Sequence, residues 1–402
     1  MFAGVVTRPV KTSRRRLLAG FAVATATSRF GLARQPVTAA GVFGAIGDGR
    51  TDSTEMLNTA ARAVPEGGGV LVVPPGRYRV TGPIFLKSGT VLTGPGATIV
   101  GIDDEWQPAA VTRALVTNVG RAAKALGDHD ITVREIAFEY IGAQFGDAHA
   151  VEFRKSRGIA VESCTFSGGG NATALLACQD TKVIRCVSVG TLNCAFDHWE
   201  GSSDCIVHDC VATCARSYGI LFTGVGTAPD DHEHAMRVSA INNRIDSPSE
   251  AGIWVCALSQ YSSVADITLR GNYIRGGVFK ASGIGASGNV RNIEISGNTI
   301  EKIHGGCSIF VRPDKWNRPR GTRIIGNRLI GCETDAVNVA LIEALGEDVE
   351  VASNHARGGD FPAMVWVDGE HAVLRDNSDG GLTGRHKYNL TGARDPTISD
   401  PY

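Results

Sequence analysis

A short pattern of apolar and polar positions recurs along most of the chain. Its central residue has an apolar residue three positions before it and, in most copies, another two positions after it. The nine central residues, called the ladder residues below, are Cys164, Cys186, Cys210, Asn243, Asn272, Asn298, Asn327, Asn354 and Asn377. Intervals of 22 to 33 residues are typical of a coil with loops of variable length. The pattern therefore predicts an all-β fold, a parallel solenoid of about ten coils.

The ladder residues are expected to stack at one corner of successive coils. Asparagine tolerates left-handed backbone angles and satisfies turn amides with its side chain, so it suits such a corner. Stacked at the spacing of neighbouring strands, the amides can bond to one another. Three early ladder positions are cysteines whose side chains would point the same way, a geometry that disfavours disulfides. We therefore expect buried, mostly free thiols.

A second strand is expected in each coil, with its own alternation of inward and outward side chains. The positions predicted to face the core are Val151, Phe153, Phe196, Ile220, Ile253, Ile309 and Val337. The predicted outward row is Glu152, Leu176, Asp197, Leu221, Trp254, Gly285, Phe310 and Asn338, and beside it run Arg154, Cys178, Trp199, Thr223, Cys256 and Arg312. One sheet face thus combines acids, arginines and aromatic rings.

The region before the repeats reads as a cap and the first coils. Residues 53–64 have a capping residue, an early glutamate and an amphipathic pattern, which predicts a short helix. Such a helix can block the open edge of the first coil. Short strands bounded by glycine and proline follow within 67–80 and 84–94. The predicted β-helix domain is 41–382, followed by a tail at 383–402.

Segments 43–52, 67–80 and 81–87 closely resemble the start of polygalacturonases and related members of the pectin-lyase-like superfamily. The resemblance is strong over roughly residues 41–99 and architectural beyond them. It implies a single-stranded, right-handed parallel β-helix and carbohydrate chemistry, without fixing the reaction.

Charge and the N-terminal segment change the picture in two ways. Lysine and arginine number 40 against 41 acidic residues, so no basic field points to nucleic acid as a partner. The one dense basic cluster is Arg14, Arg15 and Arg16, followed by a small-residue apolar run. Residues 1–35 resemble a twin-arginine export signal and linker, which implies a periplasmic or secreted protein with no integral membrane segment once the signal is removed.

The candidate site lies on the predicted outward face. Glu152 and Asp197, two coils apart, are expected to have backbones roughly 9.6 Å apart, compatible with the carboxyl separation of inverting glycosidases. Asp197 and Glu200 form a second possible acid and base pair. Candidate substrate-binding groups are Arg154 and Arg312 for uronate carboxylates and Trp199 and Trp254 for sugar faces. Packing beneath a loop is the alternative for the tryptophans.

Residues 194–200 contain the highest concentration of chemically reactive side chains in the sequence: two carboxylates, an imidazole and a tryptophan ring within one predicted strand. They resemble in part the Tyr-Gly-Phe-Asp-Pro-His phrase of alginate epimerases, matching at Phe196, Asp197 and His198, with Cys-Ala in place of Tyr-Gly and without the proline. His198 is a candidate base near neutral pH. Strict alternation would instead point it inward as a structural histidine.

The leading interpretation is an exported enzyme that cleaves a polysaccharide or oligosaccharide, as a glycoside hydrolase or as a polysaccharide lyase using His198, Lys155 or an arginine. A uronan C5-epimerase and a non-catalytic glycan-binding solenoid are the alternatives. No metal site is assigned and no cofactor is expected, Ca²⁺ being possible for a lyase. The acidic and histidine-rich segment 230–234 lies in the longest insertion, where it either rims the cleft or binds a metal.

Overall fold

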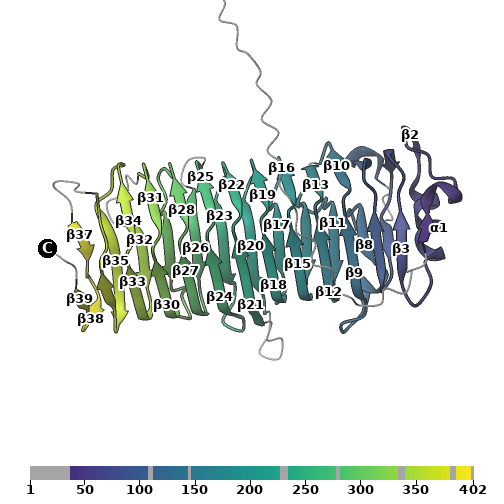
Figure 1. Cartoon of the computed structure of the whole chain (residues 1–402). Helices are drawn as coiled ribbons and strands as arrows, with labels where there is room; N and C mark the ends of the chain where they lie inside the picture. The colour runs from purple at the N-terminus through teal and green to yellow at the C-terminus, as the bar shows by residue number, and fades with distance from the viewer. Residues whose placement is uncertain are drawn as a thin grey trace, which may run out of the picture. The chain divides into compact units, whose positions relative to one another are not determined.

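The computed structural model describes residues 37–106, 112–143, 146–226, 234–277, 281–333, 340–380 and 386–399. This part of the chain is almost entirely β-structure, with strands stacked into one elongated solenoid (Figure 1). All pairings between its strands are parallel, and they form three sheets. The predicted all-β parallel β-helix is confirmed.

The sheets, named A, B and C, each receive one strand from nearly every coil. Sheet A contains β1 (Val37–Ala39), β3 (Gly69–Val72), β6 (Thr90–Thr93), β9 (His129–Arg134), β12 (Arg157–Glu162), β15 (Gln179–Ile184), β18 (Ser203–His208), β21 (His234–Ile241), β24 (Ser263–Arg270), β27 (Val290–Ser296), β30 (Arg320–Ile325), β33 (Glu347–Ala352), β36 (Val373–Arg375) and β39 (Thr397–Ser399). Sheet B contains β2 (Asp48–Asp52), β4 (Gly76–Val80), β7 (Ala97–Ile102), β10 (Ala137–Ile141), β13 (Thr165–Gly168), β16 (Val187–Val189), β19 (Val211–Thr213), β22 (Arg244–Asp246), β25 (Tyr273–Arg275), β28 (Thr299–Glu301), β31 (Arg328–Ile330) and β34 (His355–Arg357).

Sheet C carries the candidate site. Its strands are β5 (Ile84–Leu86), β8 (Val116–Asn118), β11 (Val151–Arg154), β14 (Thr173–Leu176), β17 (Phe196–Trp199), β20 (Tyr218–Gly224), β23 (Ala251–Ala257), β26 (Ser282–Ser287), β29 (Ile309–Arg312), β32 (Ala340–Leu345), β35 (Ala363–Glu370) and β37 (His386–Asn389), with β38 (Ala393–Arg394) also paired to β35. Pairing therefore continues past residue 382, where the sequence predicted the β-helix to end. The side chains that face inward from the three sheets form one continuous apolar core.

The predicted asparagine ladder is present and buried between sheets A and B. From Asn243 to Asn354, each amide Nδ2 donates to the Oδ1 of the asparagine in the next coil at 2.9 to 3.0 Å, and Asn377 is the last acceptor. The same Oδ1 also accepts the backbone N–H of the preceding ladder residue, as Asn298 does from Asn272 at 2.9 Å. Each amide thus satisfies backbone and side-chain groups that would otherwise be buried without partners.

The left-handed residue at this corner is the one before the ladder residue, not the asparagine itself as the sequence suggested. The residues with positive φ are Ser163, Arg185, Asp209, Asn242, Gly271, Gly297, Gly326, Ser353 and Asp376. This explains the Gly-Asn pairs in the clearest copies, since glycine takes φ of 61 to 67° at positions 271, 297 and 326 without a steric penalty.

The cysteines behave as predicted. All ten are free, and only Cys214 is exposed. At the ladder positions the thiols donate to backbone carbonyls, as Cys210 does to Val183 at 3.4 Å. Burial raises the pKa of Cys186 well above its usual value, and the neighbouring thiols of Cys164 and Cys210 raise it further. These thiols are packing groups rather than nucleophiles.

The predicted capping helix is α1 (Thr54–Ala63). It begins where the Asp52 carboxylate accepts the Thr54 N–H at 3.0 Å. Leu57, Ala60 and Ala61 are buried, and Asn58 fixes the helix to sheet C by donating to the Pro83 carbonyl at 2.9 Å. The helix lies at the N-terminal end of the solenoid (Figure 1). Three short 3-10 helices, η1 (Ala40–Phe43), η2 (Asp103–Glu105) and η3 (Val119–Ala122), complete the described elements.

Candidate functional site on sheet C

The pairing of sheet C places the outward-facing residues in a single row. In successive strands this outward row is Glu152, Ala174, Asp197, Leu221, Trp254, Gly285, Phe310 and Glu343. Two predicted members were misplaced. Leu176 pairs with Arg154 and not with Glu152, and the position after Phe310 belongs to Glu343. Asn338, and with it Val337, lies outside the described residues.

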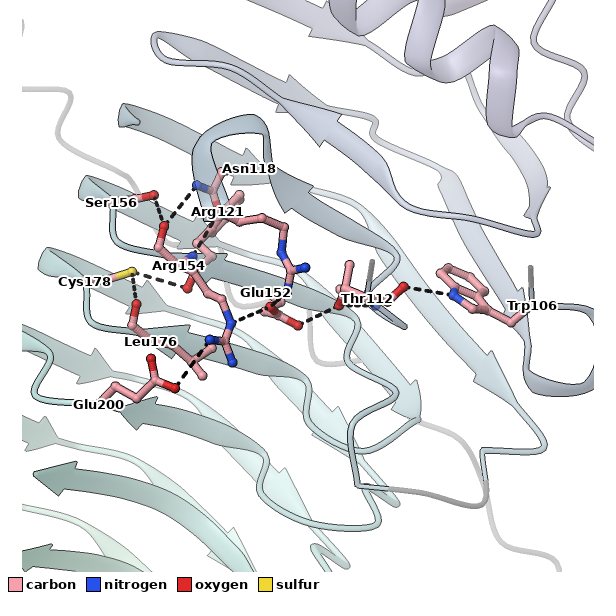
Figure 2. Close-up of polar contacts among 12 residues, drawn as sticks. Trp106, Thr112, Asn118, Arg121, Glu152, Arg154, Ser156, Leu176, Cys178 and Glu200 are labelled. Carbon is pink, nitrogen blue, oxygen red and sulfur yellow. Dashed lines mark hydrogen bonds and ion pairs between the residues drawn. The ribbon is translucent and has the colours of Figure 1, made fainter. Parts of the chain in front are cut away.

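Glu152 on β11 is held by three donors (Figure 2). Arg121 from η3 and Arg154 from the same strand both donate to Oε1, with the Arg154 Nε at 3.0 Å. Thr112 donates to Oε2 at 2.8 Å. Only 5% of the Glu152 side chain is exposed. The carboxylate is therefore committed to protein contacts, so it orients Arg154 rather than acting as a free acid or base.

The charge state of Glu152 follows from these contacts. Burial alone would raise its pKa, but the nearby His149, the Arg121 ion pair and the Thr112 hydroxyl together lower it below the usual value. Burial lowers the pKa of His149, and the Glu152 carboxylate counters part of that effect. Glu152 is thus an anion at neutral pH.

Asp197 on β17 is in the opposite electrostatic state. It is 6% exposed, and Asn171 Nδ2 donates to its Oδ2 at 2.9 Å. No described residue forms a hydrogen bond with Oδ1. Burial raises the pKa of Asp197 to about 7, Asn171 opposes this, and the Glu200 charge adds to it. Asp197 is therefore an acid that changes charge near neutral pH, which suits proton transfer.

His198, the next residue, faces the core. It is 1% exposed, its ring centroid lies 5.1 Å from that of Phe222, and neither ring nitrogen bonds to any described residue. Burial lowers its pKa to about 3, so the imidazole stays neutral. The structural alternative considered for this histidine is the one observed, and His198 has no access to substrate on the outward face.

Glu200 follows β17 at a left-handed position, with φ of 55°. Arg154 reaches it across the intervening coil, with Nη1 3.4 Å from Glu200 Oε1 (Figure 2). About a quarter of the Glu200 side chain is exposed. The structure thus brings Glu152, Arg154 and Glu200 into one hydrogen-bonded chain, with Asp197 close enough to Glu200 for the two charges to interact.

The predicted aromatic groups lie beside Asp197. Trp199, Tyr218 and Trp254, all half-buried, pack around buried Cys194, Leu221 and Cys256. Trp254 meets Tyr218 edge-on, with ring centroids 5.1 Å apart, and Phe310 in the same way at 5.5 Å. The Phe310 ring crosses over Gly285, where a Cβ would lie 2.3 Å from the ring. Trp199, Tyr218 and Trp254 thus leave partly exposed aromatic rings near the acid, while Phe310 is buried.

Arg312 is separate from the Glu152 cluster. It lies on β29 and occupies the same position in its strand as Thr223 does in β20, three coils earlier. Its Nε donates to the buried carboxylate of Glu343 at 2.5 Å, and its guanidinium lies 4.9 Å from the Phe310 ring centroid. Since 40% of its side chain remains exposed, Arg312 can still present donors on the outward face.

Several contributors were not predicted from the sequence: Thr112, Arg121, Asn171, Tyr218 and Glu343. Asn171 follows the glycine run Gly168–Gly170, which signals a tight turn before β14. Arg121 and Thr112 reach Glu152 from irregular segments, for which the alternation of apolar residues gives no signal.

Within the described residues no group of histidine, cysteine, aspartate or glutamate side chains could hold a metal ion. Residues 230–233 of the acidic segment lie outside that part. No described helix combines the length and the apolar character needed to cross a bilayer.

The sequence comparisons agree with the N-terminal resemblance. Residues 40–104 match the family model "Rhamnogalacturonase A/epimerase, pectate lyase-like". Alginate lyase 7 of Azotobacter vinelandii is 30% identical over 107 residues, which cover 24% of this chain and 12% of that protein. This sequence match therefore covers only a small part of either chain.

Solved structures share the fold over nearly the whole chain. An exopolygalacturonase from Thermotoga maritima matches with a TM-score of 0.55 and 14% identity, covering 90% of this chain and 92% of that one. The surface adhesin PfbA of Streptococcus pneumoniae matches with a TM-score of 0.59 and 14% identity, covering 90% and 91%. The fold is therefore the right-handed parallel β-helix. At such identities the likeness establishes architecture alone.

Proposed function

We propose that this chain is a carbohydrate-active enzyme that hydrolyses an acidic polysaccharide along the outward face of sheet C. The observation that carries the proposal is Asp197, a buried carboxyl with a pKa of about 7 beside aromatic rings. Below that pH it holds the proton that a glycosidic oxygen must receive as the bond breaks. The similarity to polysaccharide-active β-helix proteins supports the substrate class.

The neighbouring groups take complementary roles. Glu200 is the second carboxylate and directs a water molecule as the general base. Arg154, oriented by Glu152, binds a uronate carboxylate of the substrate. Trp199 and Trp254 support sugar rings. Arg312 is a further carboxylate partner several coils along the face.

A lyase or C5-epimerase is the second candidate, favoured by the similarity to alginate lyase 7 and by the Phe196-Asp197-His198 phrase. Both reactions begin by removing the proton beside a uronate carboxyl. Because His198 faces the core, the base would be ionised Asp197 or Lys155. Asp197 would then act in its charged form, the opposite of what hydrolysis requires.

The test is incubation of the mature protein with neutral and uronate polysaccharides while three products are followed. New reducing ends without ultraviolet absorbance indicate hydrolysis, absorbance of an unsaturated uronyl end indicates elimination, and a changed epimer ratio at constant chain length indicates epimerisation. Asp197→Asn is the matched variant. Binding without any product would overturn the enzyme proposal in favour of a glycan-binding solenoid.

We also propose export through the twin-arginine route to the periplasm or the medium, supported by Arg14–Arg16 and the apolar run after them. Residues 1–36 lie outside the described structure. Replacing the three arginines by lysines should retain the full-length precursor in the cytoplasm. Unchanged delivery of the variant would rule this route out.

A further inference from the structure

A small polar pocket opens at the turn between sheets C and A, beside the Glu152 cluster. Its volume is about 280 Å³. It is lined by Lys124, Ala125, Leu126, Lys155, Ala177, Gln179, Glu200, Gly201 and His234.

The floor of the pocket is built from residues in an unfavourable backbone conformation. Lys155, Ala177 and Glu200 directly follow β11, β14 and β17, and have φ of 49°, 51° and 55°. Backbone hydrogen bonds stack these turns, from Lys155 N–H to the Leu176 carbonyl and from Ala177 N–H to the Trp199 carbonyl, both at 2.9 Å. The same left-handed conformation recurs at corners along the whole solenoid, so here it sets the direction of these side chains and is a feature of the scaffold.

The charges in the pocket are unbalanced. Among the described residues no carboxylate forms an ion pair with Lys124 or Lys155, whereas Glu200 is paired with Arg154 at 3.4 Å. The excess charge is therefore positive. No phenylalanine, tyrosine or tryptophan is among the described residues that line the pocket, so recognition there depends on charge rather than on stacking against a sugar face.

We infer that this pocket binds the carboxylate of a second uronate, in the sugar next to the one held by Arg154. The inference rests on the proposed function and names its substrate as a chain with successive uronates. Lys155 and Lys124 are the carboxylate partners. A volume of about 280 Å³ is slightly below the range of about 300–1,000 Å³ found for pockets that hold whole small molecules, so the pocket has room for part of a chain, such as one sugar unit.

The experiment measures binding by titration calorimetry on the full chain carrying Asp197→Asn, so that turnover does not consume the ligand. The probes are short galacturonate and mannuronate oligomers and neutral cello-oligomers. Lys155→Asn, which removes the charge with a residue that tolerates positive φ, and Lys124→Gln are compared with Lys182→Gln. Lys182 is an exposed lysine 3.6 Å from Asp180 and outside the pocket.

Each pocket variant should weaken uronate binding by about five- to twentyfold and reduce its salt dependence, while Lys182→Gln leaves both unchanged. Unchanged uronate affinity in both pocket variants, or absence of uronate binding altogether, would overturn the inference. An equal loss for cello-oligomers would also overturn it. Failure of the hydrolase proposal appears separately, as full turnover by Asp197→Asn.

Discussion

Asn171 fixes the orientation of Asp197. Its Oδ1 accepts the Cys194 N–H at 2.9 Å, which leaves Nδ2 to donate to Asp197 Oδ2, also at 2.9 Å. One oxygen of the acid is thereby held, and the proton of the neutral carboxyl is left to Oδ1, a buried atom that substrate reaches only if the side chain or its surroundings move. The backbone of Cys194 thus orients Asn171, and Asn171, a residue of the preceding coil, orients the candidate acid.

Replacing Asp197 by asparagine should abolish most of the activity while preserving the fold. The amide oxygen can still accept from Asn171, but the side chain has no proton to transfer. General acid–base groups typically contribute about 10²–10⁴-fold to the rate. The measurement is kcat/KM on the preferred polysaccharide, with the circular dichroism spectrum as the control for folding. Activity within a few fold of the native chain would remove Asp197 from the mechanism.

The pH profile of the native chain separates acid from base. If protonated Asp197 is the acid, kcat/KM should fall about tenfold per pH unit above about pH 7. If ionised Asp197 is the base of a lyase or epimerase, the rate should instead rise as the pH passes 7. The profile is to be recorded with reducing-end and ultraviolet readouts on the same samples.

Stability should depend on pH through the same residue. The pKa of Asp197 is about 7 in the folded chain against an ordinary 3.8, so the folded state favours the protonated form. Its stabilising contribution is full below pH 3.8 and is lost as the pH rises through 7. As the pH is raised from acidic to alkaline, the free energy of unfolding of Asp197→Asn should therefore increase by about 2–4 kcal/mol relative to that of the native chain. Parallel denaturation curves that keep a constant separation would contradict the buried acid.

Arg154 should affect substrate binding more than folding. Arg154→Gln removes one donor to Glu152 and the partner of Glu200, and we expect KM for a uronate polymer to rise about tenfold or more. Arg154→Lys keeps the charge without the planar fork and should recover part of the loss. Glu152→Gln disturbs both arginines and should cost about 2–4 kcal/mol of stability, measured by chemical denaturation. A KM unchanged in Arg154→Gln would exclude the carboxylate role.

Asn298 should be among the most sensitive scaffold positions. Its amide makes four hydrogen bonds, accepting from the Asn272 N–H and Nδ2 and donating to Leu269 O and Asn327 Oδ1. Asn298→Ala should cost about 3–5 kcal/mol, because several buried partners lose their bonds. Asn298→Cys should cost less, since Cys210 Sγ accepts the Cys186 N–H at 3.4 Å in the same role. Equal losses in the two variants would show that acceptance by the thiol adds no stability.

The architecture was predictable because the repeat carries its own register. Apolar residues on either side of each ladder residue must both face the core, which fixes the phase of two strands per coil. Leu176 was wrongly placed in the outward row because segments 150–153 and 174–177 were aligned with each other. The first segment begins before β11, whereas the second begins within β14. Alternation has a period of two, so it does not distinguish a shift of two residues.

The site was less predictable because its chemistry depends on side chains from other coils. Glu152 looks like a free acid in the sequence, and only the positions of Arg121 and Thr112 show that it is committed to ion pairing. Asp197 looks like an ordinary surface acid, and only its burial raises its pKa. Alternation alone foresaw the inward orientation of His198, since that depends on nothing outside its own strand.

The change from thiols to amides along the ladder divides the molecule into parts with different resistance to local opening. Coils from Asn243 onward are joined by amide hydrogen bonds of 2.9 to 3.0 Å in series. Those of Cys164, Cys186 and Cys210, which carry Glu152 and Asp197, are joined at this corner by longer thiol contacts, such as Cys186 N–H to Cys210 Sγ at 3.4 Å. Opening there breaks weaker hydrogen bonds, because thiols are weak donors and acceptors, so backbone amides near the candidate site should exchange with solvent sooner than those of the C-terminal coils. The corner that opens most easily therefore belongs to the coils that carry the candidate site, where a polymer substrate would bind and be released.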